Sequence, residues 1–133
     1  MKGFFAEALA IARYHIMLVA MFATVVFAFV MTGHRPWALT LVVAVDWFLI
    51  NLMNRITDIE EDLRNGIPGT ERVARRKTAL TVFSVVLMAS SFVVTHLVWP
   101  MLTPFRVIVQ LIGLGYNYKI VPTPKGLSRF KEI

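Results

Sequence analysis

The chain contains no cysteine, and charged residues are scarce. Without cysteine there is neither a disulfide framework nor a thiolate metal site, and the sequence gives no indication of whether the protein's compartment is oxidising or reducing. Charged residues make up 17% of the sequence, against about 25% in a typical soluble domain. Hydrophobic residues make up 57%, and the mean hydropathy is +0.66. The composition therefore indicates an integral membrane protein.

Four apolar runs are long enough to be candidate membrane spans, at about residues 16–31, 37–53, 79–99 and 103–118. A helix needs about 20 mostly apolar residues to cross the hydrocarbon core. Turn residues such as Pro36 and Pro100 separate the runs within each pair. Arg106, near the start of the fourth run, is expected to extend its charge to the membrane interface. The predicted fold is an all-α, multi-pass transmembrane bundle of four spans, with one long polar loop over residues 55–77.

The basic residues of this chain flank the apolar runs instead of forming one patch, so its net charge of +6 does not indicate a nucleic-acid partner. Arg35 and Arg106 fall on one side of the predicted bundle. The positive-inside rule then places the opposite side, with both termini and the polar loop, in the cytoplasm of a cell-membrane protein. That side carries the other twelve of the 14 basic residues: Lys2, Arg13, Arg55, Arg64, Arg72, Arg75, Arg76, Lys77, Lys119, Lys125, Arg129 and Lys131.

A polar row follows the second apolar run, where Asn54, Asp58 and Asp62 are spaced four residues apart. On one continuous helix these three side chains share a face, and ionisable groups at membrane depth usually mark a functional site. Their oxygens are hard ligands that suit Mg²⁺, which often adds oxygens from a substrate phosphate. The row spans roughly 12 Å, so two ions, or one ion with a bridging diphosphate, fit better than a single ion.

The polar loop adds the cations of "GTERVARRK", which are Arg72, Arg75, Arg76 and Lys77. Such a set is able to hold the remaining charge of a phosphate group. A plainer interpretation is that these cations only fix the topology and that the acidic residues form a solvated helix end. Both interpretations remain open from the sequence.

The segment "NRITDIEEDLRNGIPGTERV" resembles the first aspartate-rich motif of the UbiA superfamily of intramembrane prenyltransferases. In that family an Asn-x-x-x-Asp-x-x-x-Asp row ends the second membrane helix, and a basic loop follows. The segment "LGYNYKIVPTPKGLSRFKEI" resembles the loop after the family's fourth helix, with tyrosine and lysine at the membrane edge. The resemblance implies Mg²⁺-dependent transfer of a prenyl group from an isoprenyl diphosphate to an aromatic or lipid acceptor within the membrane.

The resemblance also implies roles for individual residues. Asn54, Asp58 and Asp62 would hold Mg²⁺ against the diphosphate, with the two aspartates as the catalytic residues. Substrate-binding roles would fall to Arg72 and Lys119 as anion clamps and to Tyr116 in the pocket wall.

Two departures from the family pattern qualify this expectation. Arg55 stands where many members have an aspartate. The family fold also has about twice as many spans and a second aspartate-rich motif, which this sequence lacks. The chain therefore resembles the amino-terminal half, and activity would need a complementary carboxy-terminal half. The alternative is a non-catalytic four-helix membrane subunit, or a truncated remnant, that binds a phosphate headgroup.

Three further features of the sequence carry expectations of their own. Asp46, within the second run, either extends a polar cavity or pairs with a neighbouring helix. Asn51 falls within the angular range of the polar row and is expected to line a cavity. The "GLG" at residues 113–115 indicates close helix packing through small residues.

Overall fold

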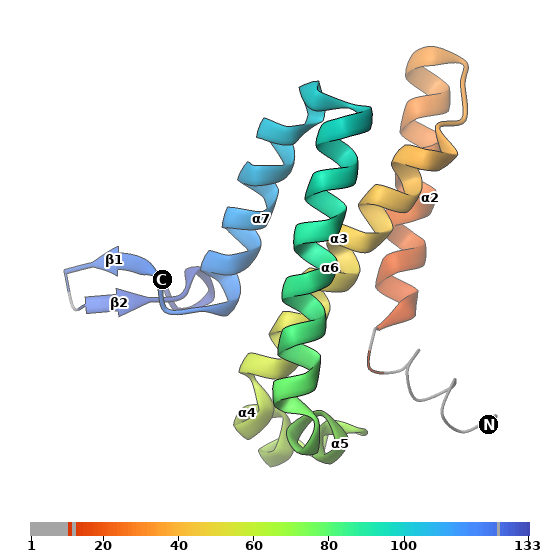
Figure 1. Ribbon diagram of the computed structural model, residues 1–133. Coiled ribbons are helices and arrows are strands. Elements are labelled where there is room, and N and C mark those ends of the chain that lie inside the picture. Colours follow the sequence, from red (N-terminus) through yellow and green to blue (C-terminus); the bar gives the residue numbers. More distant parts are fainter. Residues whose placement is uncertain (1–10, 12, 125) are drawn as a thin grey trace.

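The computed structural model describes residue 11, residues 13–124 and residues 126–133, and this part of the chain is mostly helical. Lys2 and Lys125, both counted in the charge asymmetry, lie outside it. The described part contains four long helices: α2 (Tyr14–Thr32), α3 (Trp37–Thr57), α6 (Lys77–Val98) and α7 (Thr103–Asn117). Successive long helices run in opposite directions, so the connections α2–α3 and α6–α7 lie at one end of the bundle (Figure 1).

Three of these helices, α2, α3 and α6, are long and apolar enough to cross a membrane. This agrees with the first three expected spans, and it makes a membrane location plausible by length and composition. The fourth expected span forms α7, which has 15 residues and is therefore about 22 Å long. Because the hydrocarbon core is about 30 Å thick, the fourth span and the cytoplasmic placement of the termini stay predictions.

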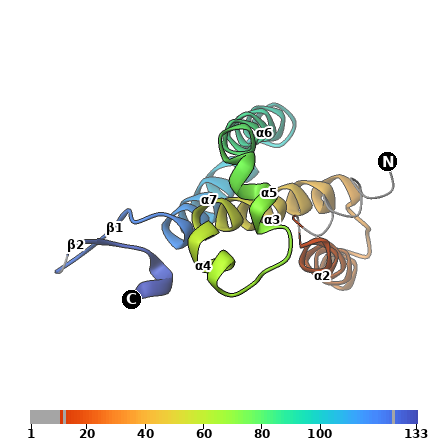
Figure 2. The ribbon, with the colours of Figure 1, turned by 90° about the horizontal axis from the view of Figure 1, so that it is seen from below.

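Helix α3 lies at the centre and packs against α2, α6 and α7 (Figure 2). It contributes most of the buried side chains, among them Leu49, Leu52 and Ile56. Helix α2, in contrast, has no buried residue and exposes large apolar side chains such as Phe22 and Phe27. A helix that is apolar all round and unburied within the protein is typical of a span surrounded by lipid.

The sequence predicts one long polar loop over residues 55–77. The structure differs, because two short helices form within this segment. These are α4 (Ile59–Arg64) and α5 (Thr70–Arg75), and Val73 of α5 is fully buried beside Leu52 and Ile56. Gly69 precedes α5 with a φ of 82°, a left-handed conformation that glycine adopts without strain. The segment is therefore folded onto the end of α3, which fixes the position of its charged side chains.

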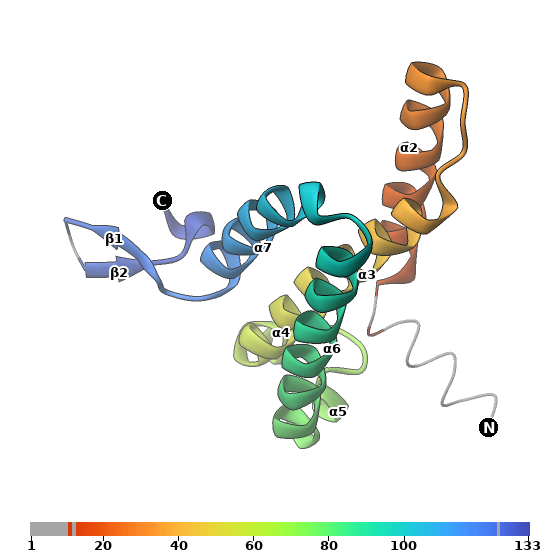
Figure 3. The ribbon, with the colours of Figure 1, turned by 45° about the horizontal axis from the view of Figure 1, so that its top comes forward.

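A small β-hairpin follows α7, which the all-α expectation did not include. Its strands are β1 (Val121–Thr123) and β2 (Gly126–Ser128), with Val121 opposite Ser128. Pro122 and Pro124 disfavour a helix here, since proline lacks the N–H that a helix interior needs. The hairpin projects beyond α7, and the chain then turns back into the short 3₁₀ helix η2 (Phe130–Glu132) (Figure 3).

A buried polar network joins α3, α6 and α7 within the bundle. Arg106 of α7 is only 5% exposed and forms a two-point ion pair with Asp46 of α3. Its remaining N–H groups donate to the Ser91 carbonyl at 2.8 Å, the Ser91 hydroxyl at 2.6 Å and the Thr95 hydroxyl at 2.5 Å. The expectation that Arg106 extends to the interface is therefore wrong. Of the two interpretations of Asp46, pairing with a neighbouring helix is the one observed.

Helix α7 approaches α3 closely at Gly113. A Cβ atom added there would lie 2.9 Å from Cγ1 of Ile50, which is too close for an ordinary contact. Asn117, one turn further, donates from Nδ2 to the carbonyl oxygens of Gly113 and Ile50 at 2.9 and 3.3 Å. The expected small-residue packing is thus confirmed at Gly113.

Candidate functional site

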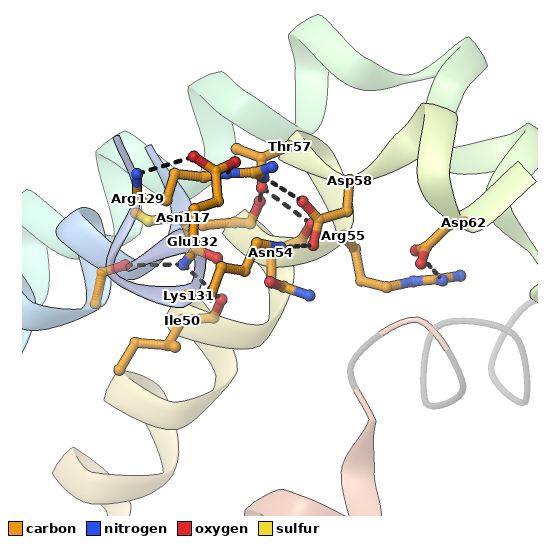
Figure 4. Close-up of polar contacts among 12 residues, drawn as sticks. Ile50, Asn54, Arg55, Thr57, Asp58, Asp62, Asn117, Arg129, Lys131 and Glu132 are labelled. Carbon is orange, nitrogen blue, oxygen red and sulfur yellow. Dashed lines mark hydrogen bonds and ion pairs between the residues drawn. The ribbon is translucent and has the colours of Figure 1, made fainter. Parts of the chain in front are cut away.

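The expected polar row lies where α3 meets α4, but its three residues do not share one continuous helix. Helix α3 ends at Thr57, and Asp58 separates it from α4. The Thr57 hydroxyl donates to the carbonyls of Met53 and Asn54, both at 3.1 Å, a pattern that often bends a helix. The expectation of one straight helix through Asp62 is therefore wrong. Asp58 and Asp62 pair with different cations (Figure 4).

Asp58 is 7% exposed, and two cations from the far end of the chain bind its carboxylate. Its Oδ1 accepts a hydrogen bond from Arg129 Nη1 at 2.7 Å, and its Oδ2 accepts one from Lys131 Nζ at 2.5 Å. Arg129 also donates from Nε to Glu132 at 2.7 Å. The carboxylates of Glu132 first, and of Asp58 after it, raise the pKa of Arg129 above its ordinary value. The guanidinium therefore remains charged beside Asp58.

Asp62 pairs with Arg55, the residue that departs from the family pattern. Arg55 Nη1 lies 2.5 Å from Asp62 Oδ2, and Arg55 Nη2 donates to the Pro68 carbonyl at 2.9 Å. Arg55 is 2% exposed, so this is a buried ion pair. The pair connects the end of α3 to α4 and to the turn before α5. Arg55 thus neutralises the carboxylate that the sequence assigns to a metal.

Asn54 lies one turn before Asp58, and its Oδ1 is buried without a hydrogen-bond partner among the described residues. It lines a groove of about 550 Å³ between α3 and α7, together with the expected cavity residue Asn51. Apolar side chains form most of this wall: Trp47, Ile50, Val109, Ile112 and Tyr116. Ligand pockets commonly have a volume of about 300–1,000 Å³ and a mostly apolar lining. The groove therefore has the size and character of a site for an apolar chain.

The three expected substrate-binding residues lie at different places. Tyr116 lines the apolar groove, and its ring lies 5.7 Å from Lys131 Nζ. Arg72 is exposed and lines a separate cavity of about 550 Å³ over residues 66–72 with Arg75. Lys119 is exposed just after α7 and contributes to the charge around Glu132. The structure thus brings Tyr116 near Asn54 and places Arg72 in another cavity.

The donor chemistry of the Asn54–Asp58 end fits Mg²⁺, although the described residues contain no group of three or more acidic, histidine or cysteine side chains placed to hold a metal. Mg²⁺ usually takes one or two carboxylates and completes its shell with water and phosphate oxygens. Asn54 Oδ1 supplies an oxygen that no described residue satisfies, and Asp58 supplies a nearly buried carboxylate. Asn54 and Asp58 would hold the ion, and Asp62 would join them only after leaving Arg55.

Arg129 and Lys131 were not among the expected site residues, and the sequence placed them only in the charge count. Nothing in their spacing indicates that they return to Asp58, because their position depends on the hairpin and on the 3₁₀ helix after it. Comparison of the chain with protein-family models, curated proteins and solved structures finds no match. The resemblance to the UbiA superfamily therefore rests on the two sequence motifs alone.

Proposed function

We propose that this chain is part of a membrane prenyltransferase that binds Mg²⁺ and an isoprenyl diphosphate at the junction of α3 and α4. The observation that carries the proposal is that Asn54 belongs to two environments. Its amide oxygen, which has no hydrogen-bond partner among the described residues, lies one turn from the buried carboxylate of Asp58, and Asn54 also lines the apolar groove between α3 and α7. A prenyl diphosphate has the same two parts, an anionic head and an apolar chain.

The charges around Asp58 support binding of an anionic head. Asn54 and Asp58 would coordinate Mg²⁺, which when bound offsets the negative charge that develops on the leaving diphosphate. Arg129 and Lys131 lie on Asp58 itself and are positioned to donate to phosphate oxygens in the same place. Trp47, Ile50 and Ile112 line the groove and would pack against the prenyl chain beside the carbon at which the bond breaks.

In this proposal an aromatic or lipid acceptor would receive the prenyl group within the membrane. A complementary carboxy-terminal half would supply the second acidic motif. The end of the bundle that carries α4 and α5 would face the cytoplasm of the cell membrane, since the described basic residues other than Arg35 and Arg106 belong to that side. Arg72 and Lys119 remain proposed anion-binding residues outside the immediate surroundings of Asp58.

A second candidate function is a non-catalytic membrane subunit that binds a phosphate headgroup. The observation that favours it is that both aspartates already have cationic partners, Asp58 with Arg129 and Lys131 and Asp62 with Arg55. Basic side chains alone, without a metal, suffice to hold a lipid phosphate. The two functions differ in whether binding requires Mg²⁺ and the prenyl chain.

Replacing both aspartates, as Asp58→Asn with Asp62→Asn, is expected to weaken Mg²⁺-dependent binding of farnesyl diphosphate at least tenfold, about 1.4 kcal/mol. Asparagine keeps the size of each side chain and removes the negative charge that attracts the ion. The measurement is equilibrium binding of radiolabelled farnesyl diphosphate to membranes containing the full chain, with and without Mg²⁺.

The matched control is Glu60→Gln with Glu61→Gln, which removes two exposed carboxylates from the same helix α4. This control should bind as the unaltered chain does. Equal Mg²⁺-dependent binding by the double aspartate variant would refute the metal assignment. The headgroup function would be favoured by binding that depends on neither Mg²⁺ nor the prenyl chain and that is abolished by competing phosphatidic acid vesicles.

A further inference from the structure

Both carboxylate oxygens of Asp58 are engaged by cations that lie more than 70 residues later in the chain. Arg129 binds Oδ1 and Lys131 binds Oδ2, at 2.7 and 2.5 Å. The Asp58 side chain is 6% exposed, and those of Arg129 and Lys131 are 18% and 20% exposed. Because this carboxylate is nearly buried, a metal ion that approaches either oxygen would compete with these cations for the same space and the same negative charge.

The four charged groups at this point balance one another. Asp58 and Glu132 each contribute one negative charge, and Arg129 and Lys131 each contribute one positive charge. Arg129 connects the two carboxylates, since its Nη1 donates to Asp58 and its Nε donates to Glu132. A cation entering beside Asp58 would therefore meet a carboxylate whose charge its ion-pair partners already offset, which weakens the attraction.

The segment that carries the two cations is seated on α7 by an aromatic side chain. The ring of Phe130 lies so close to Gly115 that a Cβ atom there would overlap Phe130 Cε2. The backbone N–H and Nε of Arg129 also donate to the Glu132 carboxylate across the 3₁₀ helix, at 3.2 and 2.7 Å. Residues 129–132 are thus held in one position against α7, and we call this segment the basic latch.

We propose that the basic latch regulates the site by competing with Mg²⁺ for the carboxylate of Asp58. The proposal rests on the proposed function, in which Asp58 is a Mg²⁺ ligand. When the latch is seated, Arg129 and Lys131 exclude the ion from both oxygens. When it leaves, the carboxylate becomes available and the two cations are free to donate to an incoming phosphate. Lys131 also lies over the ring of Tyr116, so the latch contacts the lining of the apolar groove.

The test is calorimetric titration of Mg²⁺ into the purified full chain in detergent micelles. Removing both cations, as Arg129→Gln with Lys131→Gln, is expected to tighten Mg²⁺ binding about tenfold if the latch is seated about 90% of the time. Phe130→Ala keeps both charges and removes the side chain that seats the latch. It should therefore tighten Mg²⁺ binding in the same direction.

Two controls keep the outcomes distinguishable. Arg64→Gln removes one exposed cation from the cavity that Asp58 also lines, and it should change Mg²⁺ affinity less than either Arg129→Gln or Lys131→Gln. Asp58→Asn should abolish the site, and unchanged Mg²⁺ binding in that variant would overturn the proposed function. If Asp58→Asn abolishes binding while the double glutamine variant and Phe130→Ala bind no tighter than the unaltered chain, the latch alone is refuted.

Discussion

Replacing Arg106 with leucine is expected to lower the stability of the bundle by about 3–5 kcal/mol. Each of the five N–H groups of Arg106 has an acceptor, and Asp46 and Ser91 provide four of these hydrogen bonds. Among the residues that the structure describes, the change leaves the nearly buried carboxylate of Asp46 with Gln110 alone, which donates to it at 2.8 Å. It also removes the guanidinium from its position 4.7 Å from the Phe92 ring centre. Thermal unfolding followed by circular dichroism in detergent micelles measures the loss.

The control for this prediction is Arg35→Leu, which removes an exposed arginine and should change the unfolding temperature little. The double variant Asp46→Leu with Arg106→Leu should recover much of the lost stability, since no unpaired charge then remains in the bundle. If Arg106→Leu unfolds at the same temperature as the unaltered chain, the network does not hold α3, α6 and α7 together.

Replacing Arg55 with leucine is expected to cost about 3–5 kcal/mol as well, for a related reason. Arg55 is 2% exposed and is the cationic partner of Asp62, which is itself 7% exposed. The substitution also removes the hydrogen bond to the Pro68 carbonyl, one of the contacts that hold the turn before α5. We expect a lower unfolding temperature and faster proteolysis within residues 58–76, measured by limited digestion of the chain in micelles.

A double-mutant cycle with Asp62→Leu separates the ion pair from the rest of this effect. The double variant should lose less free energy of unfolding than the sum of the two single variants, because removing both side chains leaves no buried charge without its partner at this position. Strict additivity of the two substitutions would mean that the Arg55–Asp62 contact contributes nothing to stability. The cycle also bears on the proposed function, in which Asp62 would join a metal site only after leaving Arg55.

The helical part of this fold was predictable because it depends on local sequence. Apolar runs bounded by Gly33, Pro36 and Pro100 gave helix positions within a few residues of those observed. The hairpin was not predictable in the same way, because its three-residue strands are too short for an alternating pattern. The break at Asp58 was also missed, since the residues around it keep helical spacing while the Thr57 hydroxyl and the Arg55–Asp62 pair decide the local geometry.

The candidate site was predictable in its residue types but not in its pairings. The spacing of Asn54, Asp58 and Asp62 singled out the end of α3 correctly as a place where buried polar groups gather. Which cation binds each aspartate depends on contacts between distant segments. Arg129 and Lys131 lie 71 and 73 residues from Asp58, and Arg106 lies 60 residues from Asp46. Sequence spacing along one helix carries no information about such pairs.

The measurement that tests the central claim most directly is the affinity of the unaltered full chain for farnesyl diphosphate in micelles, with Mg²⁺ and with EDTA in its place. If Asn54 and Asp58 hold Mg²⁺ against a diphosphate, binding with Mg²⁺ should be at least tenfold tighter, about 1.4 kcal/mol. Farnesol, which lacks the diphosphate, should show no such dependence. Equal affinity for farnesyl diphosphate with Mg²⁺ and with EDTA would contradict the proposal that the end of α3 is a metal-dependent diphosphate site.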